Sequence, residues 1–264
     1  MRQGFSLVEL SIVLVILGLL TGGILTGQSL IRAAELRSVT TEFKNYQTAV
    51  MTFRDKYFAL PGDMANATDF WGAMDADFTT CAALNSTSPS TDTLTCNGNN
   101  DGYVSGSVGS ISSGYETFRF WQHLSNAGLV EGNYTGVTAS TSSGLAVAGQ
   151  NVPRSKMSDA RWGIWYNSGD QNGNTTMYAV DYGNRFDFIG PQGAGTSPLT
   201  PEEAWNIDKK VDDGRPAYGK VIARGWNDTC ASADDGSSAK DDLNASYLLS
   251  SLDKACGLQF IQMF

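Results

Sequence analysis

The sequence has few of the residues on which most enzymes and nucleic-acid-binding proteins depend. Its 264 residues include one histidine, which excludes multi-histidine metal sites. Only 18 lysines and arginines stand against 27 aspartates and glutamates, and this net charge of -9 argues against a nucleic-acid groove. With 41% hydrophobic and 17% charged residues, the chain is not a disordered acidic tail either. We expect one large folded domain or two small ones.

Catalytic motifs are scarce as well. The serine-rich run at residues 140–144 lacks the Gly-x-Ser-x-Gly frame of a nucleophile elbow. His123 lies within a predicted helix, where a structural role is more common than a catalytic one. No Cys-x-x-Cys pair occurs, so zinc and thioredoxin-type redox sites are only weakly indicated. The sequence therefore predicts a protein that is not an enzyme.

Apolar residues are concentrated at the N-terminus. Residues 5–30 are long enough to cross a bilayer as a helix, which takes about 20 residues, yet they include the acidic Glu9. A secretory signal peptide would have a shorter apolar stretch of roughly 7 to 15 residues, followed by a small-residue cleavage site. A plain membrane anchor gives no reason for a carboxylate, which costs about 2.5 kcal/mol or more in hydrocarbon. Glu9 therefore indicates a function.

The run Gly4-Phe5-Ser6-Leu7-Val8-Glu9 and the apolar helix after it resemble the signal of type IV pilins and type II secretion pseudopilins. The resemblance implies that a prepilin peptidase cleaves between Gly4 and Phe5 and that Phe5 is then N-methylated. It also implies that Glu9 guides assembly. Because a buried unpaired carboxylate is costly, pairing of Glu9 with the N-terminal amine of a neighbouring subunit would favour one axial register.

The N-terminal helix departs from many major pilins in one respect, because it contains no proline. Four glycines are its weak points instead, each costing about 1 kcal/mol relative to alanine in a helix. They are Gly18, Gly22, Gly23 and Gly27. An unbroken helix and local melting near residues 21–27 both remain open.

The apolar pattern continues beyond the membrane segment. Apolar residues recur at spacings of three and four, which predicts one face of a helix. They are Leu36, Val39, Phe43, Tyr46, Val50, Phe53 and Tyr57. Pro61-Gly62 ends the pattern, and one helix over residues 5–57 would be about 80 Å long. A coiled-coil stalk and the chain's own globular domain are alternative covers for this stripe, and its short, aromatic-rich character favours the globular domain.

The sign of the net charge changes near the end of this predicted helix. Residues 1–60 hold six basic and four acidic side chains, whereas the remainder holds 12 basic and 23 acidic ones, a net of -11. Basic residues near the leader fit a cytoplasmic start. We expect a leader at residues 1–4, a transmembrane or filament-core helix at 5–30, its amphipathic continuation at 31–60 and a globular head at 61–264. The precursor would be a single-pass protein of the bacterial inner membrane with a periplasmic head, later part of a periplasmic or extracellular filament.

The remainder of the chain predicts short helices and antiparallel strands. Residues 115–127 form an expected helix that Gly128 ends. Strands are expected at 161–166, 176–180, 185–189 and 220–224, with residues 182–184 as a hairpin turn. Thr200-Pro201-Glu202-Glu203 predicts the start of a helix that runs to about residue 213. The fold class is therefore α+β, and the resemblance implies the pilin fold, in which a long N-terminal helix packs on an antiparallel sheet.

Four cysteines lie beyond the apolar helix, in the compartment that permits disulfides. Cys81, Cys96, Cys230 and Cys256 allow three pairings, all of them open. Proximity in sequence favours Cys81–Cys96 and Cys230–Cys256, and the second resembles the disulfide-bounded region near the end of many pilins. Each bridge is expected to contribute about 3 kcal/mol.

A polar loop follows Cys96. Asn97, Asn99 and Asp101 match the first three side-chain ligands of a calcium loop, and Gly102 stands where that loop turns sharply. The twelfth position is Val108 rather than glutamate, which excludes a complete EF-hand. A calcium ion and a plain Asn-Gly turn both remain open, and the plain turn is favoured. No other cofactor is expected.

These features predict a structural subunit of a type IV pilus-like filament. Its expected partners are identical or related pilin subunits, the prepilin peptidase, an inner-membrane assembly platform and, before assembly, the membrane itself, with no direct contact to nucleic acid. One alternative is a type II secretion pseudopilin or a minor pilin at a filament tip. An alternative of another class is a membrane-anchored binding module or enzyme that uses a pilin-type signal. Adhesion, motility, DNA uptake and secretion all use the same anchor, so the sequence does not choose among them.

Overall fold

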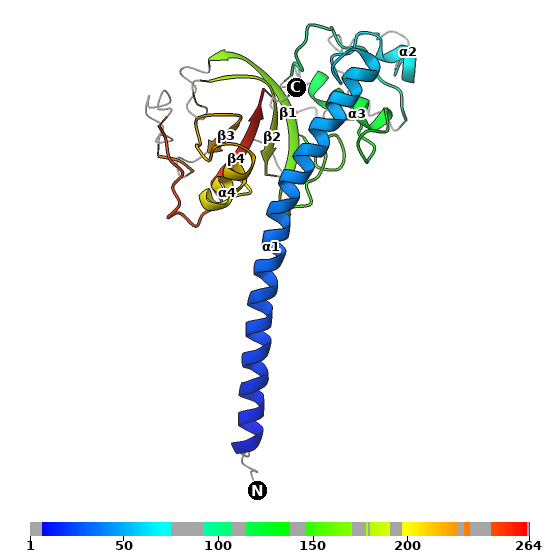
Figure 1. Ribbon diagram of the computed structural model, residues 1–264. Helices are drawn as coiled ribbons and strands as arrows, with labels where there is room; N and C mark the ends of the chain where they lie inside the picture. The colour runs from blue at the N-terminus through cyan, green and yellow to red at the C-terminus, as the bar shows by residue number, and fades with distance from the viewer. Residues whose placement is uncertain are drawn as a thin grey trace.

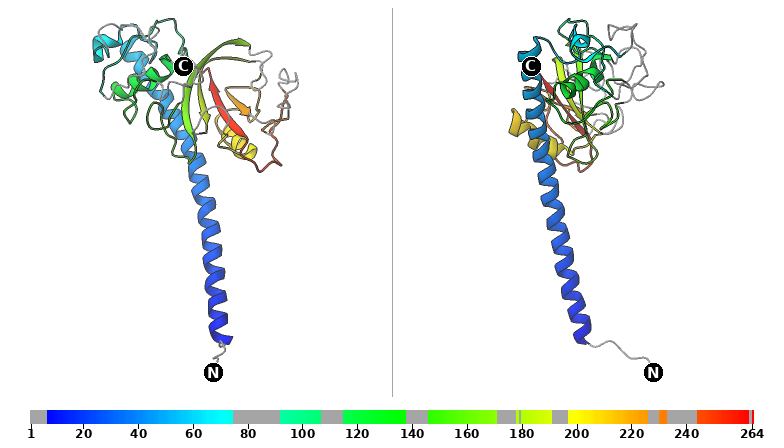
Figure 2. Two further views of the ribbon diagram at one scale, coloured as in Figure 1. Left: turned by 180° about the vertical axis from the view of Figure 1, so that it is seen from behind. Right: turned by 90° about the vertical axis from the view of Figure 1, so that its right-hand side faces the viewer.

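A single long helix dominates the computed structural model. The structure describes residues 7–74, 92–106, 115–137, 146–170, 178, 180–190, 197–225, 230–232, 244–262 and 264. Helix α1 (Leu7–Tyr57) has 51 residues and runs unbroken through all four of its glycines. Its first half, which we call the stem (residues 7–31), extends away from everything else, whereas its second half lies along the head (Figures 1 and 2). We use "head" for the described residues from 58 onward.

The second half of α1 is covered by the chain's own head, as the apolar stripe predicted. Of the seven stripe residues, Val39, Phe43, Val50 and Phe53 are buried and the other three pack partly buried against the same core. Phe43 stacks on Phe260 with ring centroids 4.3 Å apart, and Tyr46 meets Trp162 edge-on at 5.6 Å. Burial of an aromatic side chain contributes about 1.5–3 kcal/mol, so this stripe holds the head on the helix.

The head is built on a four-stranded antiparallel sheet whose strand order is β1-β2-β4-β3. The strands are β1 (Arg161–Asp170), β2 (Asp181–Ile189), β3 (Val221–Gly225) and β4 (Cys256–Ile261). Alternate residues point to opposite faces of a sheet, and Trp162, Phe186 and Phe260 face α1. The predicted α+β architecture is confirmed: this is a pilin-like fold, a long N-terminal helix packed on an antiparallel sheet.

The predicted hairpin turn at residues 182–184 is wrong. These residues lie inside β2, where Gly183 pairs with Asn167 of β1. Gly183 has a φ of +55°, and the register of the two strands shifts between Asn167 and Asp170. The Gly-Asn pair therefore marks an irregularity within a strand pair rather than a reversal of the chain. The predicted strand at 176–180 falls mostly outside the described residues.

Three short helices complete the head: α2 (Ala67–Trp71), α3 (Tyr115–Asn126) and α4 (Pro201–Val211). Helices α2 and α3 lie near the C-terminal end of α1, whereas α4 lies where the stem leaves the head (Figure 1). The predicted capping box of α4 is confirmed, because the Thr200 hydroxyl accepts from the Glu203 backbone N–H and the Glu203 carboxylate accepts from the Thr200 N–H. This helix ends at Val211, two residues before the predicted end.

A disulfide ties the C-terminal strand to an earlier segment of the head. Cys230 and Cys256 are bonded, the pairing that sequence proximity favoured, and both are fully buried. Cys96 is also disulfide-bonded, and none of the described cysteines is free. Cys81 lies outside the described residues, so its pairing with Cys96 stays a prediction.

Candidate functional site

The stem presents a long apolar surface to its surroundings. Fifteen of its large apolar side chains are at least half exposed. They are Leu7, Val8, Leu10, Ile12, Val13, Leu14, Val15, Ile16, Leu17, Leu19, Leu20, Ile24, Leu25, Leu30 and Ile31. By length and composition α1 can cross a membrane, no part of its most apolar 18-residue window is buried, and the stem projects from the head in both views of Figure 2. Covering these side chains is worth on the order of 20 kcal/mol or more, so the stem requires lipid or other helices around it.

The polar side chains of the stem suit an apolar environment. Four hydroxyls donate to backbone carbonyls three or four residues earlier, at 2.9 Å each: Ser11 to Val8, Thr21 to Leu17, Thr26 to Gly22 and Ser29 to Thr26. Because a polar group without a partner is costly in hydrocarbon, these internal bonds lower the cost of burying the stem. Within residues 7–31 the only ionisable side chain is that of Glu9.

Glu9 lies in the first turn of α1 and is exposed among apolar neighbours. The structure thus places the predicted assembly carboxylate on the stem, at the end farthest from the head (Figure 1). Gly4 and Phe5, the predicted cleavage and methylation positions, lie outside the described residues and stay predictions.

Ion pairs mark the border between stem and head. The Arg32 guanidinium donates to both carboxylate oxygens of Glu203, Nε to Oε1 at 2.5 Å and Nη2 to Oε2 at 2.6 Å, and to Glu35 at 3.0 Å. Burial acts to raise the pKa of Glu203, but hydrogen bonding to Arg32 holds this pKa below its ordinary value. Arg32 also donates to the Pro198 carbonyl at 3.2 Å. The first turn of α4 is therefore joined to α1 where the stem begins.

The three residues of the predicted calcium loop have different hydrogen-bond partners. The Asn97 side chain accepts from the Thr68 N–H of α2 at 2.8 Å. Asn99 and Asp101 lie together, because Asn99 Nδ2 donates to Asp101 Oδ2 at 2.8 Å and the Asp101 N–H donates to Asn99 Oδ1 at 3.1 Å. Calcium binding by these three residues stays a prediction.

Two carboxylates that the sequence did not indicate lie beside Asp101. Asp63 and Glu116 each bring an oxygen within 4.8 Å of it. Asp63 accepts from the N–H groups of Gly102 at 2.9 Å and Asp101 at 3.1 Å, and Glu116 accepts from the N–H and hydroxyl of Ser105 at 2.6 Å each. Burial raises the pKa of Glu116 to about 7. These carboxylates hold the loop at residues 99–105 in place.

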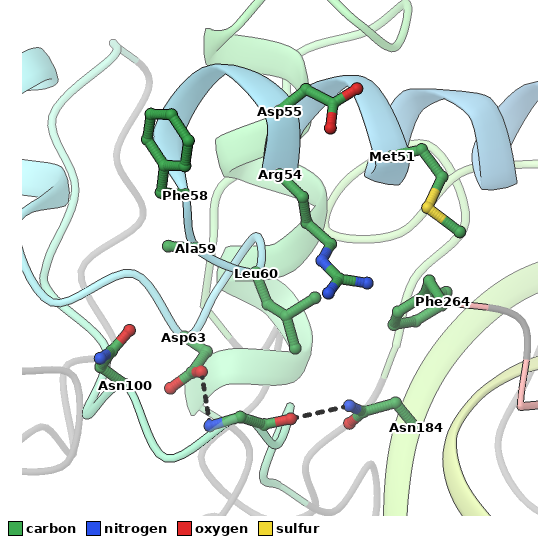
Figure 3. A pocket seen from close by; sticks show the side chains of 11 residues that line it. Met51, Arg54, Asp55, Phe58, Ala59, Leu60, Asp63, Asn100, Asn184 and Phe264 are labelled. Atoms are coloured by element: carbon green, nitrogen blue, oxygen red, sulfur yellow. Dashed lines mark hydrogen bonds between the residues drawn. The ribbon is translucent and has the colours of Figure 1, made fainter.

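A pocket of about 740 Å³ lies between this loop and the C-terminal end of α1 (Figure 3). Its lining mixes apolar and charged side chains, among them Met51 and Arg54 of α1, Leu60, Asp63 and Phe264. One wall is the loop itself, which Asn184 of β2 binds through the Gly102 carbonyl at 2.9 Å and the Val104 N–H at 2.8 Å. The pocket is thus shaped by groups from both ends of the head sequence.

His123 lies in the core. Its Nδ1 accepts from the Gly62 N–H and its Nε2 contacts the Thr95 hydroxyl, both at 2.9 Å, and the side chain is fully buried. Burial lowers the pKa of His123 to about 3, so the ring is neutral at physiological pH. A neutral ring that connects two loops fits the structural role that the sequence favoured.

The comparison with known families concerns the N-terminus. Residues 1–25 match the prokaryotic N-terminal methylation motif. The chain carries a prepilin-type signal. Such a signal is typical of type IV pilins and pseudopilins, and the helix-on-sheet fold agrees with it. No curated protein and no solved structure matches this chain.

The prepilin-type signal and the stem together suggest a type IV pilin- or pseudopilin-like subunit. The signal implies processing by a prepilin peptidase and assembly with other pilin-like subunits. It also fits an inner-membrane precursor that later joins a filament, because the apolar stem overlaps the matched residues and extends beyond them. The candidate functional site is thus the stem with Glu9 at its end.

Proposed function

We propose that this chain is the structural subunit of a type IV pilus-like filament. A prepilin peptidase would remove residues 1–4, Phe5 would be methylated, and an inner-membrane assembly platform would bring the stems of identical or related subunits together. The exposed apolar surface of the stem carries this proposal, because it requires a cover in both states. Lipid covers it in the precursor, and neighbouring stems cover it in the filament.

Glu9 sets the register of that packing in this proposal. Among apolar stems its carboxylate can pair with a cation brought by another chain, and the amine of the processed Phe5 is such a cation. A misaligned subunit would leave both charges unpaired in a medium of low dielectric, which costs several kcal/mol. The acidic head then faces outward, where its surface and loops contact other molecules.

Mass spectrometry of sheared surface filaments tests the proposal directly. The expected result is a mature chain that starts at N-methylated Phe5 and is abundant in the sheared fraction. The same processed chain confined to membranes would instead support a type II secretion pseudopilin or a minor pilin. An uncleaved chain in cells that process other prepilins would contradict the filament role and favour a membrane-anchored binding module, for which the pocket beside Arg54 is the candidate site.

A pair of stem variants separates assembly from processing. Glu9→Gln keeps the size of the side chain but removes its charge, so the variant should be cleaved normally and be absent from the sheared fraction. Thr26→Val, in the same stem, removes a hydroxyl that bonds only within the helix and should assemble as the native chain does. Filaments of Glu9→Gln at native abundance would show that the carboxylate does not set the register.

A further inference from the structure

Charged side chains are buried on the face of the sheet opposite α1. Because Trp162 and Phe186 face α1, their strand neighbours point to the other side. The cluster on that side, which we call the outer arginine cluster, has members on all four strands. They are Arg161 of β1, Arg185 and Asp187 of β2, Arg224 of β3 and Gln259 of β4, and each is at most 5% exposed.

The outer arginine cluster holds three cations and one anion. Asp187 is shared between Arg185, whose Nε lies 2.8 Å from Oδ1, and Arg224, whose Nη1 lies 3.6 Å from Oδ2. Gln259 Nε2 also donates to Asp187 Oδ1 at 3.2 Å.

Arg185 has further stabilising contacts with the rings of Trp165 and Tyr182, whose centroids lie 5.2 and 5.0 Å from its guanidinium carbon. One carboxylate thus serves two guanidinium groups, and a third remains.

The third guanidinium is that of Arg161. It is 0% exposed, and within the part of the chain that the structure describes none of its three nitrogens has a hydrogen-bond partner. Burial lowers the pKa of Arg161 to about 10, so the side chain still carries its charge at neutral pH. Asp187 attracts this charge without a hydrogen bond to it, and a buried charge without hydrogen-bond partners is among the most costly groups in a protein interior. Arg185 adds a further buried donor, Nη2, that also has no partner there.

Gly163 has no side chain beside this guanidinium. Arg161 Nη1 lies 3.5 Å from where a side chain on Gly163 would begin, and the Asp187 Cβ lies 3.7 Å from the same point. Gly163 pairs with Asp187 across β1 and β2, so it occupies the centre of the cluster. Any larger residue would take up space next to the unpaired donors.

We propose that the outer arginine cluster is a binding site for a small inorganic anion, with Arg161 as its main donor. The net charge of the cluster is +2, and the planar fork of a guanidinium offers two parallel N–H groups to an oxyanion. Bound there, the anion balances the charge of Arg161 and accepts from donors that otherwise have no partner. This site lies in the head and does not depend on the filament role.

Thermal unfolding of the full chain in detergent tests the proposal. Near-UV circular dichroism follows the tryptophans of the head while sodium chloride, sulfate or phosphate replaces sodium gluconate at constant ionic strength. At least one of the three should raise Tm along a saturating curve, by roughly 5 to 10 °C at a hundredfold excess over Kd. The curves also identify the preferred anion, oxyanion or halide. Sulfate stabilises most proteins without saturation, so the shape of the curve separates binding from that general effect.

Two arginine variants assign the effect to the cluster. Arg161→Met keeps an apolar stem of similar length but removes the charge; it should abolish the saturating rise and have a Tm in gluconate at least equal to that of the native chain. Arg154→Gln changes an exposed arginine nearby in sequence and should keep the rise. Equal saturating curves for Arg161→Met and the native chain, or no saturating curve for any anion, would overturn the proposal.

If Arg161→Met fails to fold, Gly163→Ala tests whether the anion binds at the outer arginine cluster. The added methyl would make only ordinary contacts, at 3.5 Å or more, so the head should fold as before. Because the methyl occupies space beside Arg161 Nη1, the apparent Kd for the anion should rise at least threefold. An unchanged Kd would place the anion elsewhere and overturn the assignment to this cluster.

Discussion

Glu42 of α1 accepts a hydrogen bond from the indole nitrogen of Trp162 in β1 at 2.7 Å, in the interior between helix and sheet. The same carboxylate accepts from the Ser155 hydroxyl and from the Lys156 N–H, also at 2.7 Å. It is 7% exposed, although it lies on a helix that is otherwise held to the head by aromatic packing. Three donors of the head thus converge on one carboxylate, which fixes how far along α1 the head lies.

We expect Glu42→Ala to destabilise the head by about 3 kcal/mol or more, because it leaves three donors without an acceptor in a buried place. Urea unfolding followed by tryptophan fluorescence measures this change. Asp55→Asn, which removes one negative charge from an exposed position of the same helix, should change stability by less than about 0.5 kcal/mol. Equal losses in both variants would mean that charge alone, rather than the three hydrogen bonds, is responsible.

The Arg32–Glu203 pair should contribute about 1 kcal/mol, since it is partly exposed and solvent weakens it. A double-mutant cycle with Arg32→Gln and Glu203→Gln isolates this coupling, because glutamine at position 203 still supports the capping box of α4. The coupling should shrink as salt is added. Arg37→Gln, an exposed arginine on α1, is the matched control and should show no coupling to Glu203. A coupling near zero at low salt would contradict the expectation.

Stability should fall as pH rises from about 4 to 7, partly because of Asp208. Its carboxylate is buried and accepts from the Tyr247 hydroxyl at 2.8 Å, and burial raises the pKa of Asp208 to about 7, with Asp213 and Asp212 acting in the same direction. The unfolded chain loses this proton near pH 3.9, as an unperturbed aspartate does. Between the two values the folded state binds more protons, so unfolding becomes easier as pH rises, and the effect levels off above pH 7.

Asp208→Asn should remove that part of the pH dependence. The amide stands in for the protonated acid, so the variant should match the native chain near pH 4 and exceed it in stability at pH 8. Urea unfolding at both pH values measures the difference. Asp253→Asn, at an exposed position, should leave the slope unchanged. A variant that is less stable than the native chain at pH 8 would show that folding does not raise the pKa of Asp208.

Loss of the Cys230–Cys256 bridge should cost about 3 kcal/mol, because it closes a segment with a sequence separation of 26. The Cys230→Ser/Cys256→Ser variant should unfold roughly 5 to 10 °C below the native chain. Peptide mapping without reductant checks the pairing itself, and a peptide linking Cys230 to Cys96 would contradict it. The reduced native chain should melt no higher than the variant, since it has lost its other bridge as well.

Local chemistry allowed the sequence to predict α1 and α4. The spacing from Leu36 to Tyr57 belongs to one helix face whatever packs on it, and the capping box needs only residues 200 and 203. The same reasoning failed at Gly183, because a glycine that suits a turn also suits an irregular strand pair. Strand β4 was missed, since Cys256–Ile261 is a short apolar run that becomes a strand only by pairing with β2 and β3, far away in the sequence.

The surroundings of Asp101 and Arg161 were beyond sequence reasoning for a related cause. Asp63 lies 38 residues from Asp101 and meets it only because the end of α1 and the loop after Cys96 are brought together. Arg161 is the first residue of β1, and its lack of a hydrogen-bond partner is visible only once the sheet is assembled. Spacing along the chain contains no signal for either arrangement.

The unbroken course of α1 has a mechanical consequence. A helix of 51 residues is about 77 Å long, and its helical structure continues without interruption from the stem into the part that carries the head. Because the head is attached along the side of α1 and not at its tip, a pull on the stem acts as shear across the whole interface. The contacts of Arg32, Glu42 and the aromatic stripe then bear this load in parallel, so the head is displaced together with the stem.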